Sequence, residues 1–534
     1  MSLFQHGVRV TLLMATALGL LGWLTYHTEV TFADGLRYIH QAEQIDKGAW
    51  SDGILKAVDH PLHPIAIAAV HEVIGGDGPI AWQRSAQAAS ILASVLLVIP
   101  LYLLTLEIYG PSTAWLGALL VAANPIVGFV TINLLSECTF LLFWTWGLWA
   151  AVRFLREGRF SWLPLTIGFS ALAYLARPEG MLLPLALVAT LLVLPLHWAT
   201  RIYWPRWWMA VAFLVVGPFL LAGPYMAAKG GIGTKPSIAR LIGTAPKAPP
   251  TALEREKPLP ADQTTFQTYR YAILRMFRVM RASVTTSMLP LSLLGLIVAW
   301  PWSLRARAWL FSGILLALAA AGLVRLHATG GYLTIRHAIV PGMLLTLAAA
   351  NGLAWLMRSV VIEGRWIGLG RERFRPGPAV WAALLALLVA LPHARHAAHA
   401  KGCFDVYHEA GSWIADVKGR DHGKVLDLTD WALYFSQSPG FRFSEVNWAA
   451  IDPTTRWIVA RDAHIRGHFQ YSRLVNDLIG GRRPVVTFPS HPVKGRVQIK
   501  IFDRLTPPPS ALAGPTHDRG ISPQVSTEAR IIRR

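Results

Sequence analysis

Apolar residues along this chain are grouped in long runs that short polar segments separate. Most runs have roughly 17–25 residues, the length of a helix that crosses a hydrocarbon core of ~30 Å. The pattern therefore predicts a polytopic α-helical membrane protein. Eleven spans are expected, near residues 8–26, 84–106, 113–130, 134–152, 161–176, 181–198, 207–226, 284–302, 308–324, 337–357 and 379–393.

The first run could also belong to a cleaved signal peptide, because Arg9 precedes it. No convincing small-residue cleavage site follows this run, and ten further spans do. We therefore expect the first helix to be retained, in a transmembrane domain that covers residues 1–394.

Positive side chains between the spans predict an orientation. If the N-terminus is cytoplasmic, the inner loops carry many arginines, whereas the short outer turns carry only Arg177, Arg325 and Arg336. This asymmetry is the positive-inside pattern of a protein of the inner (plasma) membrane. An odd number of spans then puts the C-terminal part outside the cell membrane.

Three segments face outward in this topology: residues 27–83, residues 227–283 and everything after residue 394. Within the first outer loop, 27–83, residues 33–47 and the apolar stretch 65–73 are too short to span the bilayer. They predict two helices that lie in the membrane interface.

The sequence changes character after about residue 400. Short strands are expected at 424–429, 456–461, 484–488 and 497–502. Helical patterns at 405–418 and 469–479 lie around them, which predicts a small extracytoplasmic α/β domain over residues 395–505. Because no glycine-rich phosphate loop follows a strand, no nucleotide is assigned to it. Residues 506–534, which begin with a run of prolines, predict a disordered tail.

The amino-acid composition and charge indicate which kinds of partner the protein contacts. The chain of 534 residues is 53% hydrophobic and has a formal net charge of +20. Its basic residues are distributed among the loops between spans, which favours contact with membrane lipids over a nucleic-acid partner. Two cysteines, Cys138 and Cys403, make no disulfide framework.

Asp34 is the first candidate for chemistry, because it follows the first span by only a few residues. A carboxylate there could take a proton from an acceptor, although Asp at the start of a helix is equally typical of an N-cap. Ionisable groups near bilayer depth usually line a cavity, although long charged side chains also reach the interface easily at span ends. Those expected at the outer ends of the spans are Asp34, Arg84, Glu137, Arg177, Glu179, Arg325, Arg336 and His337.

Five motifs together carry a family resemblance. The stretch from Asp34 to Tyr38 resembles the first-outer-loop Asp motif of GT-C glycosyltransferases, and more narrowly that of family 39, the protein O-mannosyltransferase and lipid A aminoarabinose transferase group. The stretch from His60 to Pro64 is similar to the His-Pro-rich segment of the same loop. Three further motifs resemble recurring elements of the later outer turns: residues 135–138, 176–180 and 335–341.

The resemblance implies a GT-C-like fold and an inverting transfer of a hexose or pentose. The sugar would move from a polyprenyl-phosphate donor to a lipid, glycan or protein acceptor on the outer face. Asp34 would be the catalytic base, without a second acid beside it, because Gly35 stands where many family members have one. The donor phosphate would contact Arg336, Arg177 and Arg84. The substrate-binding candidates are Tyr38, His60, His63, Glu137, Glu179 and His337. The two glutamates could bind sugar hydroxyls or pair with those arginines.

No cofactor is expected, and no spacing of ligand residues resembles a dedicated metal site. Phosphate is a good leaving group, so a base and cations suffice for the reaction. Every charged candidate at the membrane surface precedes residue 340, so the outer α/β domain is expected to be dispensable for the chemical step.

Two other functions fit parts of the pattern. A transporter or flippase for lipid-linked sugars would need midplane charges or broken helices in matched halves. The centres of the predicted spans carry no Asp, Glu, Lys or Arg. A non-catalytic membrane scaffold, whose outer domain binds a partner, is the second alternative. The sequence leaves the sugar, the acceptor and the oligomeric state open.

Overall fold

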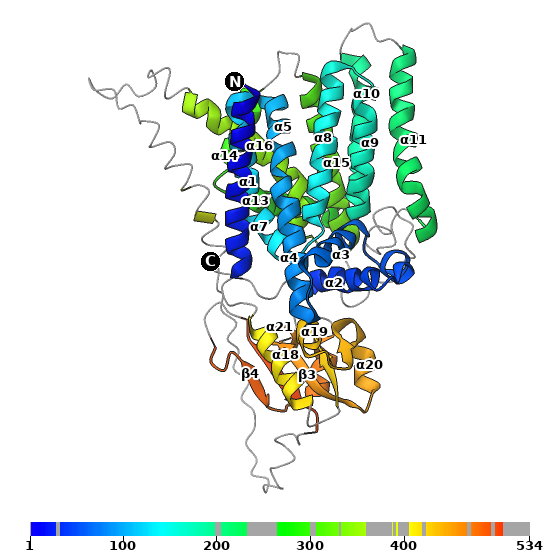
Figure 1. Cartoon of the computed structure of the whole chain (residues 1–534), viewed down its shortest axis with the longest axis vertical. Helices are drawn as coiled ribbons and strands as arrows, with labels where there is room; N and C mark the ends of the chain where they lie inside the picture. The colour runs from blue at the N-terminus through cyan, green and yellow to red at the C-terminus, as the bar shows by residue number, and fades with distance from the viewer. Residues whose placement is uncertain are drawn as a thin grey trace, which may run out of the picture.

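A helical bundle and a smaller α/β domain at one of its ends make up the protein (Figure 1). The computed structural model describes residues 2–27, 33–197, 204–231, 264–299, 306–330, 333–358, 387, 391–392, 405–418, 423–466, 471–492 and 497–505. The described residues of the bundle form α1 (Leu3–Tyr26), α4 (Gly78–Leu96), α5 (Val98–Tyr109), α6 (Pro111–Ala122), α7 (Pro125–Ile132), α8 (Glu137–Glu157), α9 (Trp162–Ala176), α10 (Leu182–His197), α11 (Trp204–Lys229), α13 (Thr265–Val284), α14 (Leu289–Val298), α15 (Ala306–Gly330) and α16 (Ile339–Arg358).

Fewer helices than the eleven predicted spans meet the requirements for crossing a membrane alone. Among the described residues, six are long and apolar enough, or up to eight if each of two bent helix pairs is one span. The helices α9 and α10 have 15 and 16 residues, fewer than the ~20 that a straight span needs. The predicted span 379–393 lies outside the described residues, apart from residues 387 and 391–392.

The predicted span 284–302 differs most from the structure. The helix α14 has only 10 residues, and it turns by 91° from α13 at a short break. Thr285, in this break, has φ 66°, a left-handed conformation that interrupts the helix. Hydropathy alone does not reveal such a bend, because the residues on both sides of it are apolar.

Small residues bring α14 and α16 into backbone contact. A Cβ atom at Gly295 would lie 1.8 Å from the Ala348 carbonyl oxygen, and one at Gly352 would lie 2.2 Å from the Leu291 carbonyl oxygen. Asn351 reinforces this crossing, since its amide donates a hydrogen bond to the Gly295 carbonyl at 3.0 Å. Close packing of small residues is a common way for helices to associate within membranes.

The first outer segment contains three helices, α2 (Ala33–Asp46), η1 (Ser51–Lys56) and α3 (Leu62–Ile74). The helices α2 and α3 lie across the end of the bundle, between it and the α/β domain (Figure 1). One face of α2 buries Leu36, Ile39, Ala42 and Ile45, which recur at the helical period. The opposite, more polar side of α2 is therefore free to contribute to a site.

A five-stranded sheet with the order β2-β1-β3-β5-β4 forms the centre of the C-terminal domain. Its strands are β1 (Lys424–Asp427), β2 (Gly440–Arg442), β3 (Thr455–Arg461), β4 (Val486–Phe488) and β5 (Ile499–Asp503). The strands β1, β2 and β3 are parallel, whereas β5 is antiparallel to β3 and β4. The described helices around the sheet are α18 (Asp405–Lys418), α19 (Trp431–Ser436), α20 (Val446–Ile451), α21 (Asp462–Ile465) and α22 (Ser472–Ile479).

The four strand segments expected from the sequence coincide with β1, β3, β4 and β5, but β2 was not anticipated. Only Phe441 of the three residues of β2 is apolar, so no alternating pattern marks this strand, whereas the equally short β4 lies in a longer apolar stretch. The helices α19 and α21, which follow β1 and β3, lie at the edge of the domain that faces α2 (Figure 1). The carboxyl ends of these parallel strands therefore point toward the bundle.

Candidate active site

Asp34 and Arg336 form an ion pair at the end of the bundle. The Asp34 side chain stands in the first turn of α2, and Arg336 stands in the 3₁₀ turn η3 (Ile335–Ala338). Arg336 Nη1 lies 2.5 Å from Asp34 Oδ2. Both side chains are mostly buried, with exposed fractions of 16% for Arg336 and 21% for Asp34. The structure thus joins the expected base to the expected phosphate ligand.

The turn that carries Arg336 is fixed by its neighbours. His337 Nδ1 accepts a hydrogen bond from the Thr334 backbone N–H at 3.1 Å and lies 2.9 Å from the Thr334 hydroxyl. Arg275, on α13, donates a hydrogen bond to the Leu333 carbonyl at 3.3 Å. His337 therefore shapes the turn, and Arg336 is held by a preorganised segment.

Arg37 connects Asp34 to a second carboxylate, that of Asp59. Arg37 Nη2 lies 3.4 Å from Asp34 Oδ1, and Arg37 Nε lies 3.2 Å from Asp59 Oδ2. Asp59 is only 3% exposed, whereas nearly half of the Arg37 side chain is exposed. Sequence reasoning missed both residues. The sequence gives only weak indications of their roles. Arg37 follows Asp34 by one helical turn, and Asp59 directly precedes the His-Pro motif.

Electrostatics favour the ionised form of Asp34. Burial raises the pKa of this carboxyl, but the guanidinium groups of Arg336 and, secondly, Arg37 together lower it by more than burial raises it. The net effect holds the pKa of Asp34 below its ordinary value of 3.8. Asp34 is therefore unprotonated at neutral pH, although its charge is largely neutralised by Arg336.

Arg177 lies between two carboxylates. Its Nη1 is 2.8 Å from Glu137 Oε1, and its Nε and Nη2 are 3.3 and 2.7 Å from the two oxygens of Glu179. Glu137 is fully buried at the N-terminus of α8. Because these carboxylates already engage its donors, Arg177 has the contacts of a structural clamp. Gly180, the last residue of the motif at 176–180, has no room for a side chain, since a Cβ atom there would lie 2.2 Å from the Tyr174 backbone nitrogen.

The histidines of the first outer loop are buried. His63 is 0% exposed, with Nδ1 2.9 Å from the Thr139 hydroxyl and Nε2 3.1 Å from the Leu134 carbonyl oxygen. Tyr38 packs edge-on against His63, and its hydroxyl lies 2.9 Å from that of Ser136. These contacts tie α2 and α3 to the turn before α8. Their substrate-binding roles therefore remain only predictions.

His60 lies in a separate aromatic group. Its ring packs edge-on against Tyr174 at 5.0 Å between centroids and lies 5.7 Å from the ring of Tyr225. His60 is 5% exposed, so it lies below the surface. It follows Asp59 directly in the chain and so lies beside the Arg37–Asp59 pair.

Arg84 is not joined to the Asp34 cluster by any ion pair within the part of the chain that the structure describes. The reason is the start of α4, which begins at Gly78 with a proline in its first turn rather than at residue 84. Arg84 consequently lies well inside the helix, on an exposed side. Its expected contact with phosphate receives no support from this placement.

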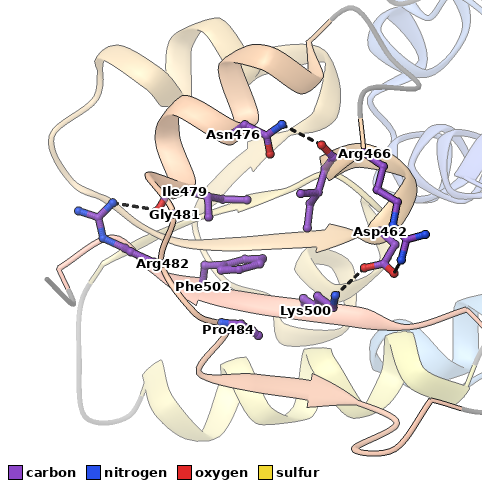
Figure 2. Close-up of a pocket in the computed structure, with 10 residues that line it drawn as sticks. Asp462, Arg466, Asn476, Ile479, Gly481, Arg482, Pro484, Lys500 and Phe502 are labelled. Carbon is purple, nitrogen blue, oxygen red and sulfur yellow. Dashed lines mark hydrogen bonds and ion pairs between the residues drawn. The ribbon is translucent and has the colours of Figure 1, made fainter. Parts of the chain in front are cut away.

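A hollow of about 440 Å³ opens on the C-terminal domain, away from these residues. Figure 2 shows it between α21, α22 and β5, with Asp462 between Lys500 and Arg466. Asp462 lies 2.6 Å from Lys500 Nζ and 2.9 Å from Arg466 Nη2, so these opposite charges are paired. The hollow shares no residue with the Asp34 cluster, and we assign it no ligand.

Within the described residues, no group of three or more His, Cys, Asp or Glu side chains could hold a metal ion. The chemistry that the site can perform with its own residues is proton transfer at Asp34 and stabilisation of an anion at Arg336 and Arg37.

A family model and several solved structures are similar to this chain. The family model of dolichyl-phosphate-mannose-protein mannosyltransferases matches residues 59–221, which include His60, Glu137 and Arg177. No curated protein sequence matches the chain. ArnT from Cupriavidus metallidurans, bound to undecaprenyl phosphate, has a similar structure, with a TM-score of 0.54 and 14% identity over 95% of this chain and 99% of ArnT.

The oligosaccharyltransferase of Archaeoglobus fulgidus is also similar. Its apo form gives a TM-score of 0.54 and 11% identity over 87% of this chain and 71% of that one. The same enzyme, AglB, in complex with an inhibitory peptide and a dolichol-phosphate, gives a TM-score of 0.52 and 11% identity over 86% and 70% of the two chains.

The family model matches less than a third of the chain, and the solved structures, at 11–14% identity, share its overall fold. Both findings support the resemblance to GT-C glycosyltransferases, of the protein O-mannosyltransferase and ArnT group, that the outer-loop motifs indicated.

Proposed function

We propose that this protein transfers a single hexose or pentose from a polyprenyl-phosphate donor to a lipid, glycan or protein acceptor on the outer face of the plasma membrane. Asp34 is the base and Arg336 the ligand of the donor phosphate. The observation that carries the proposal is the 2.5 Å contact between Arg336 Nη1 and Asp34 Oδ2, which joins a base and a phosphate-binding cation.

The reaction follows from these two groups. An acceptor hydroxyl gives its proton to Asp34 while its oxygen attacks the anomeric carbon of the sugar. The bond from that carbon to the phosphate oxygen breaks, and polyprenyl phosphate leaves with the electron pair. Because attack and departure occur on opposite faces, the configuration at the carbon is inverted. Arg336 stabilises the charge that develops on the phosphate, a preorganised electrostatic role.

Donor binding also prepares the base. Without the donor, Arg336 neutralises Asp34 and lowers the pKa of its carboxyl. A donor phosphate offers Arg336 two oxygens in the bidentate geometry that guanidinium groups favour. The phosphate then shares Arg336 and adds negative charge nearby. Both changes raise the pKa of Asp34, so it becomes a stronger base only when a donor is present.

Arg37 is a second candidate ligand for the phosphate, because nearly half of its side chain is exposed. The structural contacts of Arg177 make it a support for the site, since Glu137 and Glu179 occupy its donors. We therefore narrow the phosphate ligands from the three arginines expected from the sequence to Arg336, assisted by Arg37.

The test is an assay of the purified full chain against a panel of polyprenyl-phosphate sugars, with acceptors from the cell envelope. Turnover of at least one donor by the wild type, lost in Asp34→Asn, is the expected result. Glu72→Gln is the matched control, because Glu72 is an exposed acid on α3 in the same outer segment. Equal turnover by wild type and Asp34→Asn would contradict the proposal.

A further inference from the structure

The polar side of α2 contacts the C-terminal domain. Tyr434, on α19, donates a hydrogen bond from its hydroxyl to Glu43 Oε1 at 3.1 Å. Arg442, on β2, has its Nη2 2.8 Å from His40 Nε2. The rings of His40 and Tyr434 also pack edge-on, with centroids 5.2 Å apart. Two side chains of the domain thus contact two side chains of the helix that carries Asp34.

These four residues form one connected network. Because arginine only donates, His40 Nε2 must accept from Arg442, which puts the proton of a neutral imidazole on Nδ1. His40 Nδ1 lies 3.2 Å from Glu43 Oε2 and donates to it. The exposed fractions of the His40 and Glu43 side chains are 29% and 16%, so solvent screens these bonds only in part. Each hydrogen bond of this network therefore fixes the orientation of the side chain that makes the next one.

The domain side of this contact is rigid. Tyr434 is 5% exposed and belongs to a helix whose start is held by Asp427, at the end of β1. The Asp427 carboxylate accepts hydrogen bonds from the backbone N–H groups of Thr429 and Leu433, both at 2.7 Å. Arg442 ends β2, which pairs with β1 in the same sheet. Tyr434 and Arg442 are therefore both held in place by the sheet.

Asp34 lies on the same rigid element as these contacts. From Asp34 to His40 the helix α2 rises by ~9 Å, at ~1.5 Å per residue. A short helix moves as a unit, so a tilt at His40 and Glu43 displaces the Asp34 carboxylate relative to Arg336. Displacement of a catalytic group by ~1 Å can cost ~100-fold in rate.

We propose that Tyr434 and Arg442 are positioning residues, which hold α2 so that Asp34 faces Arg336. The C-terminal domain is then part of the catalytic unit, in contrast to the expectation from sequence that it is dispensable for the chemical step. This inference rests on the proposed role of Asp34 as the base.

The test compares the full-length double variant Tyr434→Phe/Arg442→Gln with the wild type by two readouts. Amide hydrogen exchange in residues 33–46 needs no substrate, and it should become about fivefold or more faster. Sugar transfer with the donor identified in the panel should show a ~10-fold lower kcat, with donor affinity within about twofold of the wild type. A control variant, Tyr407→Phe, removes a buried hydroxyl in the same domain that accepts from Arg461 at 3.5 Å, and it should change neither readout.

The outcomes separate this inference from the proposed function. Wild-type exchange in α2 of the double variant would overturn the positioning role, whatever the activity. Faster exchange with an unchanged kcat would overturn it too, because α2 would then be anchored without effect on catalysis. A wild type that turns over no donor would contradict the proposed function, while the exchange experiment would still report whether the domain anchors α2.

Discussion

Arg336 Nη1 lies 2.5 Å from Asp34 Oδ2, so the two side chains with the clearest chemical roles satisfy one another in the structure. This pairing has a direct consequence for binding. A donor phosphate must compete with Asp34 for Arg336, and a change in either residue alters both donor affinity and the basicity of the carboxylate.

Loss of Arg336 should weaken donor binding. A hydrogen bond to a charged group contributes ~1.5–3 kcal/mol, so Arg336→Ala should lower donor affinity by roughly 10–100-fold. Arg336→Lys should restore it only in part, because an ammonium lacks the bidentate geometry. Equilibrium binding of the donor to the detergent-solubilised protein measures both effects.

The control for these variants is Arg358→Ala. Arg358 lies at the far end of α16, and its Nε donates to the Ala354 carbonyl at 3.2 Å. It should leave donor affinity unchanged. A folded Arg336→Ala protein with wild-type donor affinity would remove Arg336 from the phosphate site.

The pH dependence of the rate should differ between the free enzyme and its donor complex. In the free enzyme, burial raises the pKa of Asp34, but Arg336 and Arg37 hold it below 3.8. The acidic limb of kcat/KM for the donor, which reports the free enzyme, should therefore lie at low pH. The acidic limb of kcat, which reports the complex, should lie at higher pH because the phosphate shares Arg336. Coincident limbs would contradict donor-dependent activation of the base.

Arg177 should prove structural. Because Glu137 is fully buried, Arg177→Ala leaves its carboxylate unpaired in the interior. Breaking a buried ion pair in this way costs ~3–5 kcal/mol, so we expect a lower Tm and lower yield. The double variant Arg177→Met/Glu137→Gln should recover much of the stability. If Arg177→Ala were as stable as the wild type and bound donor weakly, the phosphate-binding role predicted for Arg177 from the sequence would be correct after all.

A buried acid in the C-terminal domain should make stability depend on pH. Burial, and secondly the Asp427 carboxylate, raise the pKa of Asp430 to about 7. The folded state therefore holds a proton that the unfolded chain releases near pH 3.8. The resulting loss of stability grows as the pH rises from about 3.8 to about 7 and is constant above it.

Asp430→Asn should remove this effect. Asparagine tolerates the φ of 66° at this position and can still accept from the Phe443 N–H. Calorimetry should find a Tm ~2–4 °C above the wild type at pH 8 and a smaller difference at pH 5. Glu409→Gln, at an exposed position on α18, serves as the control. A difference that is the same at both pH values would show that Asp430 does not titrate in this range.

Much of the architecture could be predicted from periodicity, because membrane helices and alternating strands leave local patterns. The helix expected at 405–418 has the bounds of α18, and α2 begins at the expected residue 33. The predicted spans 161–176 and 181–198 nearly coincide with α9 and α10. The pattern could not give the number of spans, because the bend at Thr285 lies between two apolar stretches.

The candidate site was only partly predictable for a similar reason. Sequence placed Asp34 and Arg336 at the same side of the membrane, but their pairing depends on how α2 and η3 pack. Pairing of Glu137 and Glu179 with an arginine was one of two roles that the sequence left open for them, and the structure shows it at Arg177. Nothing in the sequence indicated that Tyr434 reaches α2. The Tyr434–Glu43 contact joins segments far apart in the chain, where no spacing rule applies.

The central claim, that Asp34 is the base of sugar transfer, is tested most directly by measuring donor affinity and turnover of folded Asp34→Asn. General base catalysis contributes ~10²–10⁴-fold, so kcat should fall by that factor. Donor affinity should be unchanged or up to ~10-fold higher, because Arg336 is no longer shared with a carboxylate. A folded Asp34→Asn protein that keeps wild-type kcat would exclude Asp34 as the base.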